Sequence, residues 1–123
     1  MILHQVAQHV EDLDRAIAFY TRLIGESPIA RFDPPGLAFF RLGDTRLLLE
    51  RGAPTALIYL RVDDVRATVE QLRGEGTTIA GEPHVIFSDA EGTFGPAGAD
   101  EWMAFITDSE GNLVGLASQN PPG

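Results

Sequence analysis

The chain of 123 residues contains no cysteine and no lysine. Without cysteine it has no disulfides, no thiolate nucleophile and no cysteine metal ligand. Without lysine it cannot form a Schiff base with a carbonyl substrate. The nine basic residues, all arginines, face 18 acidic ones, and the net charge of −9 argues against nucleic acid as a partner. Such a charge attracts cationic ligands, although its simplest role is solubility.

Long apolar runs are also missing. No stretch approaches membrane-spanning length, so we expect no membrane partner. The opening letters MILHQV lack a basic segment followed by a long apolar one, and we expect no signal peptide. Together with the lack of cysteine, this predicts a cytoplasmic protein. A hydrophobic share of 44% fits one globular domain with a real core.

The sequence contains one structural plan, a predicted strand followed by a predicted helix, in two copies. Residues 5–20, QVAQHVEDLDRAIAFY, predict a strand, a helix start at Asp12 and an amphipathic helix. The plan returns in residues 57–72, LIYLRVDDVRATVEQL, with Asp64 as the helix N-cap. The two copies superimpose at an offset of 52 residues, which matches Val10 with Val62.

Each copy is followed by three further predicted strands. One half alone can hardly bury both a helix stripe and a sheet face. We therefore predict an α+β fold, a single domain of residues 1–123 with two βαβββ modules, about 1–52 and 55–119. The modules are expected to form a curved mixed sheet around a cavity, with both helices on the convex face. The expected strands are 3–10, 29–32, 37–42, 46–50, 56–62, 78–87, 102–107 and 113–118, and the expected helices are 13–24 and 65–73.

These segments resemble the vicinal oxygen chelate superfamily, which includes glyoxalase I, extradiol dioxygenases, methylmalonyl-CoA epimerase and bleomycin-resistance proteins. The resemblance spans nearly the whole chain. It implies a small organic molecule as ligand and, usually, a homodimer. Because the chemistry of the superfamily is diverse, the fold alone selects no reaction. The matching segments are HQVAQHVEDLDRAIAFYTRLIG (4–25), RLLLE (46–50), YLRVDD (59–64) and DSEGNLVGL (108–116).

Enzymes of this superfamily usually bind a divalent metal through four positions, two in each half. The resemblance places these positions on Gln5, Glu50, Leu57 and Gly115. Leucine and glycine side chains cannot coordinate a metal, and two oxygen ligands are few for a hard cation. We therefore expect a degenerate metal site and no cofactor. A divalent metal, where one binds, is expected on Gln5 and Glu50.

Two histidines are alternative metal ligands. His4 is next to Gln5, and a bulge or a one-residue slip of the strand would turn it inward. His84 together with Glu50 and Gln5 would form a chemically suitable triad. The other interpretation is that both histidines are structural or surface residues.

Side-chain alternation places Gln5 and His9 on one face of the first strand. Tyr59 and Arg61 take the matching face of the second copy. One interpretation is a ligand-binding face, with Arg61 and His9 opposite each other as a clamp for an anion or a carbonyl group. The other is that Arg61 pairs with a carboxylate and His9 lies at the rim.

Phe94 and Trp102 flank the glycine-rich segment 88–100. We predict that they line the mouth of the cavity, with the segment as a lid; core packing is the alternative.

Two functions fit these residues. The first is a small-molecule-binding protein similar to the bleomycin-resistance proteins. The alternative is a metal-dependent lyase, isomerase, epimerase or dioxygenase of the glyoxalase-like group. In the alternative, Glu50 is the general base, His9 is an acid or base, and Arg61 stabilises the oxyanion. In the first, the ligand-binding residues are Gln5, His9, Glu50, Tyr59, Arg61, Phe94 and Trp102.

Overall fold

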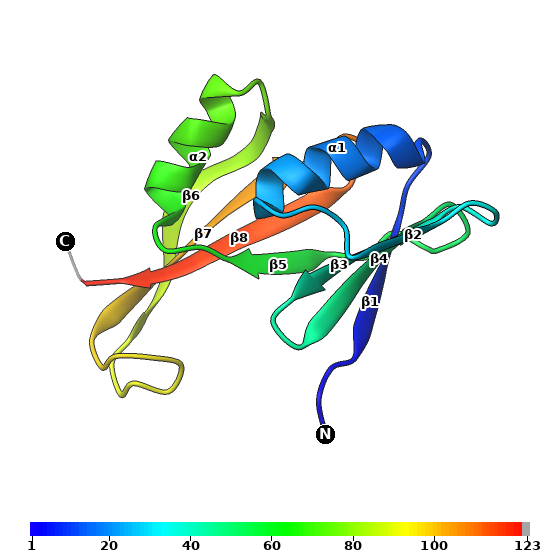
Figure 1. The fold of residues 1–123 in the computed structure, drawn as a ribbon. Coiled ribbons are helices and arrows are strands. Elements are labelled where there is room, and N and C mark those ends of the chain that lie inside the picture. The colour runs from blue at the N-terminus through cyan, green and yellow to red at the C-terminus, as the bar shows by residue number, and fades with distance from the viewer. Residues whose placement is uncertain (122–123) are drawn as a thin grey trace. The chain divides into compact units, whose positions relative to one another are not determined.

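The computed structural model describes residues 1–121 (Figure 1). The chain divides into two compact units. Unit 1 comprises Met1–Ala56 and Asp108–Asn112, and unit 2 comprises Leu57–Thr107 and the chain from Leu113 onward. Neither helix among the described residues is long and apolar enough to cross a membrane.

Unit 1 is a βαβββ module. Its four-stranded sheet has the order β1-β4-β3-β2, with β1 parallel to β4 and the other pairs antiparallel. Helix α1 contacts β3 and β4 on one face of this sheet. The elements are β1 (Gln5–His9), α1 (Leu13–Ile24), β2 (Ala30–Phe32), β3 (Leu37–Leu42) and β4 (Thr45–Glu50).

Unit 2 repeats the module. Its sheet has the order β5-β8-β7-β6, again with one parallel pair, β5 with β8. Helix α2 contacts β6, β7 and β8, and Figure 1 shows it along one side of these strands. The elements are β5 (Ile58–Arg61), α2 (Val65–Gly74), β6 (Thr78–Asp89), β7 (Ala99–Thr107) and β8 (Leu113–Asn120).

The predicted α+β fold with two βαβββ modules and curved mixed sheets is confirmed. Hydrogen bonds divide the strands into two four-stranded sheets, one in each unit. The largest difference from the expected bounds is the start of β7, which is Ala99 and not Trp102. The grouping of both modules into one domain stays a prediction.

Both helices begin where the sequence predicts. The Asp12 carboxylate accepts a hydrogen bond from the Arg15 backbone N–H at 3.1 Å, and the Asp64 carboxylate accepts one from the Arg66 N–H at 3.0 Å. Helix α1 ends at Gly25, whose φ of 85° is left-handed. These ends fix the apolar stripes that pack on the sheets.

Gln8 breaks the apolar pattern of β1 on the side facing α1. It is fully buried, yet its amide is paired twice: Nε2 donates to the Ala56 carbonyl and Oε1 accepts from the Ala56 N–H, both at 2.9 Å. This pair offsets the cost of burying the amide and ties β1 to the segment between β4 and β5. Gln5 and His9 therefore face the opposite side, as predicted from alternation.

Residues 108–112 connect β7 to β8 in sequence but belong to unit 1. The Tyr20 hydroxyl donates to Asp108 Oδ2 at 2.6 Å, and Asn112 Nδ2 donates to the His9 carbonyl at 2.8 Å. Burial, followed by the bond to Asp108, raises the pKa of Tyr20 far above its ordinary value. The phenol is thus a permanent hydrogen-bond donor inside unit 1.

Candidate functional site

In each unit the helix covers one sheet face, and most of the candidate site residues lie on the other, which we call the open face. The registers of the two parallel strand pairs correspond. Ala7 is the partner of Leu48 in unit 1, and Tyr59, 52 residues after Ala7, is the partner of Gly115 in unit 2. Equivalent positions of the two units can therefore be compared one by one.

The open face of unit 2 contains a pocket of about 260 Å³. It includes three of the residues predicted from the sequence, and it adds three polar residues, Glu101, Ser118 and Gln119. The full lining is Tyr59, Leu60, Arg61, Phe94, Glu101, Ala117, Ser118 and Gln119.

The Tyr59 ring fills the space above Gly115. A Cβ atom placed on Gly115 would lie 2.5 Å from Tyr59 Cδ2, so no larger residue fits there while the ring keeps its place. On its other side the ring meets Phe105 edge to face, with centroids 5.9 Å apart. Tyr59 is still 51% exposed, which leaves part of it free for a ligand.

Arg61 and Glu101 give the pocket one charge of each sign. They come from different strands, β5 and β7, and two residues of β8, Ala117 and Gln119, lie beside them as their partners. Among residues 1–121, neither charged side chain has a hydrogen bond or an ion pair. The alternative interpretation, that Arg61 pairs with a carboxylate, is not observed among these residues.

Asp89 holds the loop that carries Phe94. Its carboxylate accepts hydrogen bonds from the backbone N–H groups of Thr93, Phe94 and Gly95 at 2.8, 2.9 and 3.0 Å. Burial raises the pKa of Asp89, but these bonds outweigh it and hold the pKa below its ordinary value. Phe94 projects from the loop and is 70% exposed. Its ring packs against that of Phe87, with the ring centroids 5.6 Å apart.

Gln119 is a lining residue that the sequence did not reveal. Its Nε2 donates to Asp89 at 3.2 Å, while its Oε1 is buried without a hydrogen-bond partner among the described residues. The loop backbone packs directly on that oxygen, because a Cβ on Gly95 would overlap it. Alternation along the strand that begins at Leu113 could have placed Gln119 beside Ala117 on the open face.

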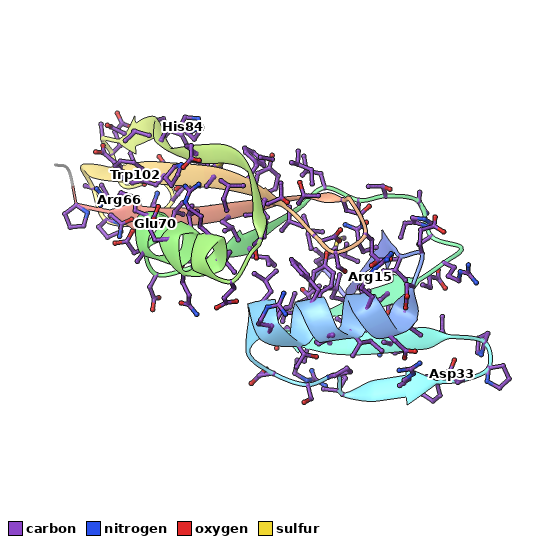
Figure 2. The ribbon with its side chains drawn as sticks, turned by 90° about the horizontal axis from the view of Figure 1, so that it is seen from above. Arg15, Asp33, Arg66, Glu70, His84 and Trp102 are labelled. Carbon is purple, nitrogen blue, oxygen red and sulfur yellow. The ribbon has the colours of Figure 1, made fainter. Side chains whose placement is uncertain are left out.

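Trp102 does not line the pocket. It points to the helix side of the sheet, where the Arg66 guanidinium of α2 lies 4.2 Å from its ring centroid (Figure 2). Glu101, one residue earlier, therefore takes the place on the open face. His84 lies exposed on edge strand β6, with its Nδ1 3.0 Å from the Glu82 carbonyl oxygen.

On the open face of unit 1, Gln5 contacts an arginine. Its Oε1 accepts a hydrogen bond from Arg46 Nε at 3.1 Å, and Arg46 Nη2 lies 2.8 Å from His4 Nε2. Because a guanidinium only donates, the His4 nitrogen is the acceptor in this contact. The Gln5 oxygen and the His4 nitrogen, two atoms that were expected as metal ligands, therefore both face the Arg46 guanidinium.

His9 and Glu50 are partners in the β1–β4 register. His9 Nδ1 lies 2.8 Å from the Arg51 carbonyl, and Nε2 lies 2.7 Å from Glu11 Oε1. The hydrogen bond to Glu11, more than any other effect, raises the pKa of His9. Glu50 is half-buried, and its carboxylate has no hydrogen bond or ion pair within the described chain.

The residues present do not fit the divalent metal implied by the superfamily. The partner of Gln5 is Arg46, and Glu50 follows four residues later on that strand, about 13 Å along it at roughly 3.3 Å per residue. The counterpart of Gly115 in unit 1 is Leu48, whereas Glu50 corresponds to Ala117. Within residues 1–121, no three His, Asp or Glu side chains converge.

Comparisons with known proteins agree on the family. The model described as Glyoxalase/Bleomycin resistance protein/Dioxygenase superfamily matches residues 2–116. No curated protein sequence matches the chain.

Solved structures share the fold at low sequence identity. TnmS3, described as an antibiotic binding protein from Streptomyces sp. CB03234, is 23% identical over 99% of this chain and 97% of its own, with a TM-score of 0.72. A lactoylglutathione lyase from Agrobacterium tumefaciens is 22% identical over 95% and 92% of the two chains, with a TM-score of 0.70. Leishmania major glyoxalase I is 24% identical over 96% and 86%, with a TM-score of 0.67.

Proposed function

Since the chain belongs to the Glyoxalase/Bleomycin resistance protein/Dioxygenase superfamily, we propose that it is a metal-independent binding protein for a small organic molecule. The relatives in structure include both a protein described as antibiotic-binding and a lyase, so the choice depends on this chain's own residues. The observation that carries the proposal is the Tyr59 ring above Gly115. The resemblance predicts a metal ligand at Gly115, where this chain has no side chain and the Tyr59 ring offers an aromatic surface instead.

The ligand is an aromatic molecule that carries both a positive and a negative group. Tyr59 and Phe94 offer two partly exposed rings, and Arg61 and Glu101 offer charges without partners. Ligand pockets typically have about 300–1,000 Å³. With about 260 Å³, this pocket takes a small ligand or one end of a larger one.

The test uses phenylalanine as a probe, with phenethylamine and 3-phenylpropionate as singly charged controls. Phenylalanine should shift the Gln119 side-chain amide signals in a saturable way and bind more tightly than either control. Arg61→Gln or Glu101→Gln should reduce this preference. Glu91→Gln, which changes an exposed carboxylate outside the pocket lining, should not.

The chelator EDTA should leave phenylalanine binding unchanged. Equal binding of all three probes, or binding that is lost with EDTA and restored by a divalent metal, would contradict the proposal.

The enzymatic alternative rests on Glu50, a half-buried carboxylate next to His9. It predicts exchange of solvent deuterium into 2-oxo acids, thioesters or hemithioacetals. If the wild type shows such exchange and Glu50→Gln abolishes it, the binding-only proposal is wrong.

A homodimer in the cytoplasm remains part of this proposal. Static light scattering at micromolar concentration should give twice the monomer mass of 13.3 kDa. A mass near that of the monomer would contradict the dimer.

A further inference from the structure

Arg41 and Arg46 form an unneutralised pair in a protein with twice as many acidic as basic residues. Four other arginines, Arg15, Arg31, Arg66 and Arg73, each lie within 4.0 Å of a carboxylate. Among residues 1–121, neither Arg41 nor Arg46 does.

The two arginines are direct partners in the antiparallel β3–β4 register. Residues in such positions point to the same face, with Cβ atoms about 4.5–5.5 Å apart, and like charges there are destabilising. In this acidic chain a carboxylate on a neighbouring strand would relieve the repulsion, but β1 supplies the neutral Gln5 opposite Arg46. An external anion would relieve it as well.

Arg46 is already oriented. Gln5 Oε1 and His4 Nε2 each accept one of its hydrogen bonds, and its guanidinium lies 5.5 Å from the Phe39 ring centroid. A guanidinium has five N–H donors, so donors remain for a ligand. Because its rotamer is fixed beforehand, less side-chain entropy is lost on binding.

An apolar surface adjoins the charges. Phe39 meets Phe32 edge to face with centroids 6.0 Å apart, and Phe32 is 52% exposed. A bare inorganic anion would use the arginines alone, whereas an aromatic acid would also cover Phe32.

We propose that the open face of unit 1 binds an organic carboxylate, with the carboxylate between Arg41 and Arg46 and its apolar body against Phe32. Arg–carboxylate contacts are charge-assisted and can be bidentate, which suits a planar acid. This site shares no residue with the unit 2 pocket, and it does not rest on the ligand proposed there.

The experiment is a titration of the full-length protein with sodium benzoate, followed by NMR through the backbone amide signals of Phe32 and Phe39, which every variant below retains. A saturable shift is expected. Arg46→Gln and Arg41→Gln should each weaken binding roughly tenfold or more, as expected for a lost charge-assisted bond. The Arg41 side chain is exposed and makes no hydrogen bond in the described chain, so its replacement should leave the fold intact even where Arg46→Gln does not.

Controls separate this site from others. Arg31→Gln removes an arginine that already pairs with Asp14 and Asp33, and Arg61→Gln disables the unit 2 pocket; both should leave benzoate binding unchanged. Benzamide, which has the same ring without the charge, should not bind, and phosphate should bind more weakly than benzoate. Benzoate binding that is absent, that survives Arg41→Gln, or that phosphate or benzamide equals would overturn the proposal.

Discussion

At one pair of equivalent positions, the larger side chain lies on a different strand in each of the two units. In unit 1 the edge strand β1 contributes the small Ala7 and the central strand β4 contributes Leu48. In unit 2 the edge strand β5 contributes the large Tyr59 and the central strand β8 contributes Gly115. The fold constrains the combined size of the pair more than either residue, as expected for close-packed side chains. Because the larger side chain of unit 2 lies on the edge strand, the aromatic ring of Tyr59 lines the pocket.

The helix starts differ too. Both have an aspartate cap, but α2 receives one extra bond, from its Val65 N–H to Ser118 Oγ at 3.0 Å. The start of α1 is served by Glu110, whose fully buried carboxylate accepts from the N–H groups of Glu11 and Asp12, both at 2.8 Å, and from Arg15 Nε at 2.7 Å. The start of α1 therefore depends on four N–H donors, two of them on Arg15, meeting around one carboxylate 95–99 positions away, whereas the start of α2 takes a single extra bond from a hydroxyl 53 positions away.

The largest expected effect comes from Glu110→Gln. The bond from Arg15, above all, lowers the pKa of Glu110 from 4.5 to about 2. A lowered pKa stabilises the fold above pH 4.5, and this contribution disappears as the pH falls toward 2. The shift corresponds to about 3 kcal/mol. We expect the variant to lose about that much unfolding free energy at pH 7 in urea titrations, and the wild type to approach the variant in acid.

Amide hydrogen exchange gives an internal control. Exchange at Glu11, Asp12 and Arg15 should rise in Glu110→Gln, while the start of α2 at Val65 should not change. Replacement of the exposed Glu26 by Gln should alter neither. Equal acceleration in both units would show that the dependence is not specific to unit 1.

A second test converts unit 2 to the arrangement of unit 1. Gly115→Leu should destabilise the protein by about 1–3 kcal/mol, because the new side chain meets the Tyr59 ring. Tyr59→Ala in the same chain copies the Ala7–Leu48 pair and should recover most of the loss. Thermal melts of the two single variants and the double variant measure this coupling. If the stability losses of the two single variants simply add up in the double variant, the two side chains do not compete for the same space.

The sequence predicts most of the fold because its signals are local. Asp12, Asp64 and Gly25 mark helix ends by their own hydrogen-bonding chemistry and backbone preference, and alternation assigns the sheet faces. The buried Gln8 could not be interpreted in this way, since its partner Ala56 is 48 residues away. Glu110 was missed for the same reason: its contacts join residues about a hundred positions apart.

The candidate site was less predictable than the fold. Arg61, Tyr59 and Phe94 were found from alternation and from the glycine-rich loop, and all three line the pocket. Trp102 was expected at the mouth of the cavity because it flanks the glycine-rich segment, with core packing as the alternative. It lies within β7, which starts three residues before Trp102, and its ring contacts Arg66 of α2. The strand registers that separate Gln5 from Glu50 depend on pairing between strands, which composition does not reveal.

A smaller effect distinguishes the helix–sheet contacts. In unit 2 a cation–π contact joins α2 to β7, through Arg66 and Trp102, whereas in unit 1 the Arg22–Phe19 contact lies within α1. Arg66→Gln should cost about 0.5–1 kcal/mol, the usual size at an exposed site. It should also shift the emission of Trp102, the only tryptophan. Arg66→Lys keeps the charge and should retain part of the wild-type stability and of the wild-type Trp102 emission. Unchanged Trp102 emission in Arg66→Gln would contradict the contact.

The smallest expected effect concerns His9, whose counterpart in unit 2 is the permanently charged Arg61. Both ring nitrogens of His9 face acceptor oxygens, which favours the imidazolium, and the bond to Glu11 raises the pKa above its ordinary 6.5. A raised pKa stabilises the fold fully below pH 6.5, and this contribution is lost as the pH rises through the pKa of the folded state.

NMR titration of the His9 ring should give a midpoint above 6.5 that falls in Glu11→Gln. His9→Arg, which copies unit 2, should keep the charge and remove this pH dependence of unfolding. A His9 midpoint at or below 6.5, or a pH dependence unchanged in His9→Arg, would show that the charge of this histidine does not stabilise unit 1.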